Sequence, residues 1–96
     1  MLSIQDLLDY CDLDRGEIAA IAEHEHLPLA LAAELSEVLL CSPAGVCRLH
    51  SMILENMEHA MATGHYAHAQ ALADTYQHLQ RTHPLPMQEA AALPVS

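Results

Sequence analysis

The densest group of side chains capable of chemistry is the run Glu23-His24-Glu25-His26. Glu23 and His26 have the ExxH spacing, which places two potential metal ligands on one face of a helix. A ferritin-like di-iron centre requires a second ExxH motif and two further carboxylates on facing helices, and the sequence has no second ExxH. A solvated helix end explains the run without a metal, because a histidine cation interacts favourably with the dipole there. The sequence favours this electrostatic explanation and leaves Glu23 and His26 as candidate ligands.

A second candidate metal site combines Cys41, Cys47 and His50. Cys47 and His50 share a face of one predicted helix, and Cys41 ends the helix before it, so three ligands and one open position would suit Zn²⁺. The spacing matches no known zinc motif, and buried free cysteines commonly behave as small hydrophobic residues. We therefore expect structural burial, with His50 hydrogen-bonded to a neighbour in the core. The sequence requires no cofactor at either candidate site. If either site binds a metal, the expected ion is zinc or iron.

The remaining histidines gather around a predicted turn, at His59, His65 and His68, or lie further along, at His78 and His83. As surface residues they need no special function. Histidines titrate near pH 6.5, so the alternative function is a surface whose charge responds to pH.

Catalysis has little support in the sequence. It contains no GxSxG, P-loop, GxGxxG or HExxH motif, and its serines have no triad context. A helical domain of this size rarely encloses a substrate pocket alone. We name no catalytic residue and favour a non-enzymatic role.

Charge restricts the partners. Thirteen acidic residues face three arginines and no lysine, for a formal net charge of −10. Nucleic-acid and anionic-membrane binding both depend on clustered cations, so neither is expected. Nine of the acids fall within residues 1–40, whereas six of the eight histidines fall within residues 41–96. Acidic and imidazole groups are therefore segregated along the chain.

The compartment is expected to be the cytosol. The apolar stretches 27–33 and 38–41 are far shorter than the roughly 20 residues that span a bilayer. The first residues lack the basic and apolar regions of a secretory signal. Three cysteines without a CxxC spacing fit a reducing compartment better than a disulfide framework.

The fold is predicted to be all-α, a compact bundle of about five helices in a single domain, residues 1–83. Hydrophobic residues make up 52% of the chain without any Phe or Trp, and no strand-like alternation is present. Capping and apolar periodicity place helices at about 3–11, 15–25, 28–40, 43–63 and 65–81. Asp14 with Glu17 forms a predicted capping box, and Ser42-Pro43 is a second start signal. Residues 84–96, with three prolines, are predicted to be a mobile tail.

The helix at 28–40 is apolar around most of its circumference and is therefore expected to be central. A short connection at Gly64 predicts an antiparallel hairpin of the next two helices. The helix at 43–63 is predicted to bury the face made of Val46, Cys47, His50, Ile53, Leu54, Met57 and Met61. The helix at 65–81 is predicted to bury the face made of His68, Leu72, Ala73, Tyr76 and Leu79. Apolar residues flanking these faces predict a homodimer joined through the hairpin: Met52, Ala60, Tyr66, Ala67 and Ala71.

The chain resembles small helical proteins of bacteria through the run Glu17-Ile-Ala-Ala-Ile-Ala-Glu-His-Glu-His26, followed by Pro28, Ala32-Ala33-Glu34-Leu35 and Ser42-Pro43-Ala44-Gly45. The resemblance covers most of residues 3–83 and implies a bacterial origin but no activity. From the residues we expect a non-enzymatic module for protein–protein interaction or regulation, acting as a homodimer on an unidentified protein partner. The alternative is a metal-binding or metal-sensing protein that uses histidine, cysteine and glutamate side chains.

Overall fold

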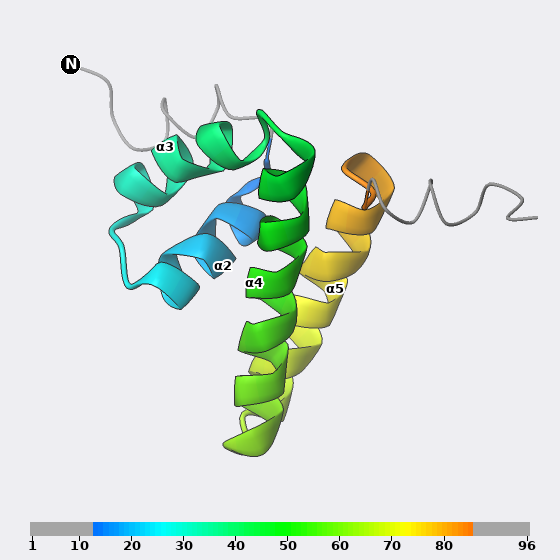
Figure 1. Ribbon diagram of the computed structural model, residues 1–96. Coiled ribbons are helices and arrows are strands. Elements are labelled where there is room, and N and C mark those ends of the chain that lie inside the picture. Colours follow the sequence, from blue (N-terminus) through cyan, green and yellow to red (C-terminus); the bar gives the residue numbers. More distant parts are fainter. Residues whose placement is uncertain (1–12, 86–96) are drawn as a thin grey trace, which may run out of the picture.

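The computed structural model describes residues 13–85, which form four helices and no strand. The helices are α2 (Arg15–Glu25), α3 (Leu29–Leu39), α4 (Pro43–Ala62) and α5 (Tyr66–Thr82). The predicted all-α class is confirmed, whereas the helix expected at 3–11 and residues 86–96 of the expected tail lie outside the described part of the chain. Helices α4 and α5 form a long antiparallel hairpin, and α2 and α3 lie across one side of it (Figure 1). None of these four helices has the length and apolar character that a membrane span requires.

The predicted helix boundaries follow from local capping, and the structure confirms them. The Asp14 carboxylate accepts from the Glu17 N–H at 3.1 Å while the Glu17 carboxylate accepts from the Asp14 N–H at 3.0 Å, which completes the capping box of α2. At the start of α4 the Ser42 hydroxyl accepts from the Gly45 N–H at 3.0 Å. Gly64, with φ at +79°, supplies the left-handed residue that ends this helix and turns the chain into α5.

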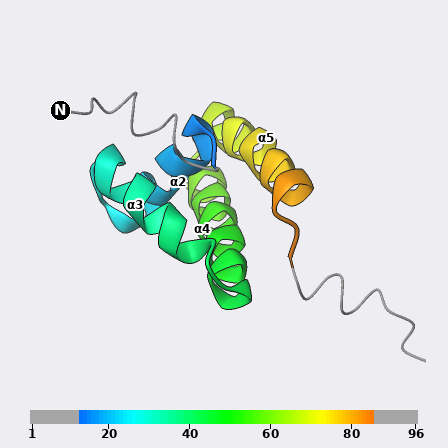
Figure 2. The same ribbon diagram turned by 90° about the horizontal axis from the view of Figure 1, so that it is seen from above.

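The prediction that the 28–40 helix is central was wrong, because α2 and α4 share that position. Helices α2 and α4 each pack against the three other described helices, whereas α3 packs chiefly against α2 and α4 at one side of the molecule (Figure 2). Residues of α3 that face these two neighbours are buried, but Leu31 is 49% and Val38 65% exposed. An apolar circumference is insufficient to make a helix central when the described elements cover only part of it.

The predicted buried face of α4 was also partly wrong. Met52 and Ala60, expected at its flanks, are 1% and 2% exposed, whereas Leu54 and Met61, expected inside, are 39% and 56% exposed. The polar residue Asn56 explains the error, because its side-chain amide is buried and donates to the Ala20 carbonyl of α2 at 2.9 Å. The predicted buried face was chosen from apolar residues, so it left out Asn56 and the part of the helix surface on either side of it. On α5, Leu72 and Leu79 are buried as predicted, but His68 is exposed.

The connection between α3 and α4 requires a glycine. A Cβ atom at Gly45 would lie 2.0 Å from the carbonyl oxygen of Leu39, a backbone atom that has no freedom to rotate away. The first turn of α4 therefore sits directly on the last turn of α3.

Gly45→Ala is expected to lower the free energy of unfolding by at least about 2 kcal/mol, because overpacking against backbone forces the two helices apart. Urea unfolding followed by circular dichroism measures the change. Ala44→Ser, at an exposed position in the same turn, serves as the control and is expected to have little effect. Equal stability of the two variants would show that the helix contact is not tight.

Candidate functional site

Five of the eight histidines line one hollow of about 610 Å³. It lies where the C-terminal end of α2 meets the second half of α4 and the start of α5. The residues that line it are Glu23, His24, His26, Glu55, Asn56, His59, His65 and His68. Imidazole, carboxylate and amide groups from three helices therefore surround one solvent-accessible volume.

His24 is held between two carboxylates. Its Nδ1 lies 2.6 Å from Oε2 of Glu25, and its Nε2 lies 2.5 Å from Oε1 of Glu55 on α4. A carboxylate accepts hydrogen bonds but donates none, so this geometry requires a proton on both ring nitrogens. Burial lowers the pKa of His24, but the hydrogen bonds and negative charges of Glu55 and Glu25 outweigh it and raise the pKa above the usual 6.5. His24 therefore acts as a cation that joins α2 to α4.

The other four imidazoles of the hollow keep nitrogen atoms available. Nε2 of His68 lies 2.6 Å from the Glu23 carboxylate, which leaves Nδ1 for another partner. Nδ1 of His65 lies 2.7 Å from the Thr63 hydroxyl, which leaves Nε2. The rings of His26 and His59 have no hydrogen-bond partner among the residues that the structure describes, so both nitrogens of each remain available.

The structure places both residues of the ExxH pair, Glu23 and His26, at the hollow. The Glu23 carboxylate is nevertheless engaged by His68 rather than by its sequence neighbour. His26 caps α2 in the left-handed conformation, with φ at 57°, which histidine tolerates better than most residues. Sequence reasoning missed the rest of the lining, because the clustering of His59, His65 and His68 at the turn gave no sign that α2 ends beside them.

The second predicted site is not assembled as a metal site. Cys41 is exposed and its thiol donates to the Glu37 carbonyl at 3.2 Å, while Cys47 is partly buried. His50 is 1% exposed, and the prediction of a hydrogen-bonded core histidine is confirmed.

The tautomer of His50 follows from its two partners. Its Nε2 lies 2.7 Å from the His83 carbonyl, which only accepts, so this nitrogen carries the proton. Its Nδ1 then accepts from the Tyr76 hydroxyl at 3.1 Å. Burial raises the pKa of Tyr76, so the hydroxyl keeps its proton for this bond. The pair ties α4 to α5 and to the segment after α5.

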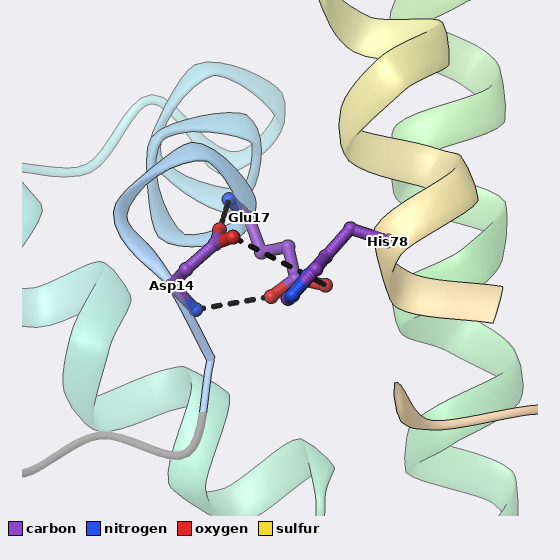
Figure 3. Close-up of side chains that lie close together, drawn as sticks. All are labelled: Asp14, Glu17 and His78. Carbon is purple, nitrogen blue, oxygen red and sulfur yellow. Dashed lines mark hydrogen bonds and ion pairs between the residues drawn. The ribbon is translucent and has the colours of Figure 1, made fainter. Parts of the chain in front are cut away.

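A different cluster, Asp14, Glu17 and His78, joins the start of α2 to α5 (Figure 3). Nδ1 of His78 lies 3.3 Å from Oδ2 of Asp14 and 3.3 Å from Oε2 of Glu17. Within the part of the chain that the structure describes, it is the one set of three potential ligands whose atoms lie within 4.8 Å of one another. The Glu17 side chain is 0% exposed, and both of its oxygens have partners, Asp14 N–H and His78. The sequence predicted the Asp14–Glu17 pair through helix capping but gave no indication of His78.

This cluster is best explained as a clamp between helices. The capping box uses one oxygen of each carboxylate, and Nδ1 of His78 lies 3.3 Å from the other oxygen of each, so the three side chains join the start of α2 to α5. Its chemistry is the pairing of a buried carboxylate with an imidazole that is partly exposed.

Comparisons with models of protein families, with curated proteins and with solved structures gave no match. The fold and the site themselves define a small all-α protein in which histidine and carboxylate side chains join α2 to the α4–α5 hairpin.

Glu17→Ala is expected to lower the free energy of unfolding by about 1–3 kcal/mol, since it removes half of the capping box and the buried partner of His78. Chemical denaturation of the variant and the wild type measures the loss of stability. Glu34→Ala, which removes an exposed carboxylate from α3, is the control. A loss no larger than that of the control would contradict the clamp.

His24→Gln is expected to destabilise the protein more at about pH 5.5 than at about pH 8.5. The folded pKa of His24 is raised, so its contribution is fully present below 6.5 and is lost as the pH rises through the folded pKa. The groups that face His24 are Glu25 and Glu55, and Arg48 lies 3.8 Å from Glu25. Urea unfolding of the wild type and of His24→Gln at the two pH values measures the destabilisation. A destabilisation that is equal at both, or larger at high pH, would contradict it.

Proposed function

We propose that the protein is a non-enzymatic, homodimeric interaction module whose two copies join through the α4–α5 hairpin. The observation that carries the proposal is an apolar seam on this hairpin, made of Leu54, Met57, Met61 and Tyr66. These residues differ from most of those expected at the dimer surface from the sequence, because Met52 and Ala60 lie in the core of the single chain.

The seam has the spacing of a helix-packing surface. Leu54, Met57 and Met61 follow one another at intervals of three and four residues, the pattern by which one helix packs along another. Leu54 and Met61 are 39% and 56% exposed, and Tyr66, at the start of α5, is 65% exposed. A shallow groove of about 410 Å³ runs beside them and is lined by Met57, Met61, Tyr66, Ala69, Gln70 and Ala73. Methionines in such a surface adapt to an imperfect fit, and alanines allow close approach.

A second copy of the chain suits this seam for electrostatic reasons. Residues 43–82 hold three acidic residues and two arginines, although the whole chain carries a formal charge of −10. The hairpin is therefore the nearly neutral part of an acidic molecule, and two copies repel each other least when they meet there. A two-fold arrangement places the same surface of both copies in contact and forms a four-helix bundle from two hairpins.

Two features support a binding role over a catalytic one. The carboxylates of Glu17, Glu23 and Glu55 are each engaged by a histidine. The seam, in contrast, presents an apolar surface that has no covering residue among those described.

Met61→Glu is expected to convert the dimer to a monomer, since it places a charge in the centre of the seam. Size exclusion with light scattering at about 10 µM chain, well above a dissociation constant of about 1 µM, measures the mass. The wild type is expected at twice the chain mass of 10.5 kDa, and the variant at 10.5 kDa. Val38→Glu changes an exposed apolar residue of α3 in the same way and is expected to leave the dimer intact. A wild-type mass of 10.5 kDa, or dissociation by both variants, would contradict the proposed interface.

A further inference from the structure

We propose that the hollow between α2, α4 and α5 binds one divalent transition-metal ion through the imidazoles of His26, His59, His65 and His68. This inference goes beyond dimerisation, because the residues of the hollow and those of the seam do not overlap. The two surfaces also diverge on α4: His59 and Met61 are two residues apart, so their side chains point about 160° apart around the helix.

The donor set is the first argument. Each of these four histidines keeps at least one nitrogen without a hydrogen-bond partner among the described residues, and all four line the same hollow. They come from the end of α2, the last turns of α4 and the start of α5, so the tertiary fold alone gathers them. Imidazole nitrogen selects Zn²⁺, Ni²⁺, Cu²⁺ or Co²⁺, whereas Mg²⁺ and Ca²⁺ prefer oxygen ligands.

The carboxylates around the hollow supply the second argument. Glu23 holds Nε2 of His68 at 2.6 Å, which orients the ring and leaves Nδ1 for a metal. Ligating histidines commonly have such a carboxylate on their other nitrogen, where it fixes the tautomer and increases the basicity of the ligand. Thr63 holds Nδ1 of His65 in a comparable way. With Glu55 also on the lining, the local charge favours a cation.

His24 is excluded from the ligand set by the same reasoning. Both of its nitrogens are bound to carboxylates, which only accept hydrogen bonds, so neither nitrogen has a lone pair to offer. It acts instead as the cation that holds Glu55 at the edge of the hollow.

The ligand nitrogens do not converge on one point, because no three of them lie within 4.8 Å of one another in the described chain. His26 and His59 are exposed and have no described hydrogen-bond partner, and exposed side chains change rotamer within nanoseconds. Binding therefore requires rotation of these two rings toward His65 and His68, which Thr63 and Glu23 hold.

Isothermal titration of the full, untagged chain with ZnCl₂ or NiCl₂ at about pH 7.5 tests the site, with MgCl₂ as the comparison. We expect one Zn²⁺ or Ni²⁺ per chain and no binding of Mg²⁺. The double variant His59→Ala/His68→Ala is expected to weaken Zn²⁺ binding at least about tenfold. His83→Ala removes an imidazole outside the hollow and is expected to bind Zn²⁺ like the wild type.

Circular dichroism melts establish that each variant is folded. If the double variant unfolds, the single variant His59→Ala gives the same readout, because that ring has no described partner to lose. Met61→Glu is expected to retain Zn²⁺ binding, so failure of the dimer and failure of the metal site are distinguishable. Equal Zn²⁺ affinity of wild type and the folded histidine variant, or no binding tighter than about 1 mM, would overturn the proposal.

Discussion

The buried amide of Asn56 fixes how α2 lies on the hairpin, and much of the molecule depends on that placement. Asn56 is 6% exposed and donates to the Ala20 carbonyl at 2.9 Å. A buried amide without its partner would cost about 1–3 kcal/mol, so α2 is held in one register along α4. This register sets the end of α2 beside the second half of α4, where His24 reaches Glu55.

Histidine takes the place of lysine in joining the helices of this acidic chain. Among the described residues, three histidines connect α2 and its N-cap to the hairpin through carboxylates. His78 contacts Asp14 and Glu17 near the start of α2, and near its end His68 contacts Glu23 and His24 contacts Glu55. The same choice of residue makes the hollow suitable for a transition metal, because a neutral imidazole is a ligand and an ammonium group is not. The histidines therefore serve as the partners of the carboxylates that join the helices.

Helix existence and helix ends could be predicted from the sequence because both are local. The Asp14–Glu17 capping box, the Ser42-Pro43 start and the Gly64 stop each act within a few residues, and the structure confirms all three. The hydrogen-bonded burial of His50 was predictable too, since a polar ring in a core needs a partner. Its partners, Tyr76 and the His83 carbonyl, were not, because they lie 26 and 33 residues away.

The sequence by itself determined the helical class, the helix limits and the segregation of acidic from imidazole residues, all of which depend on composition or short-range spacing. Only the tertiary structure decided that α2 and α4 rather than α3 are central and that Asn56 belongs to the core. It also decided that Glu23 pairs with His68 rather than acting with His26. The physical reason is that an apolar or ionisable side chain carries no information about which distant helix will cover it. That choice is made by packing and by satisfying buried polar groups across helices that are far apart in the chain.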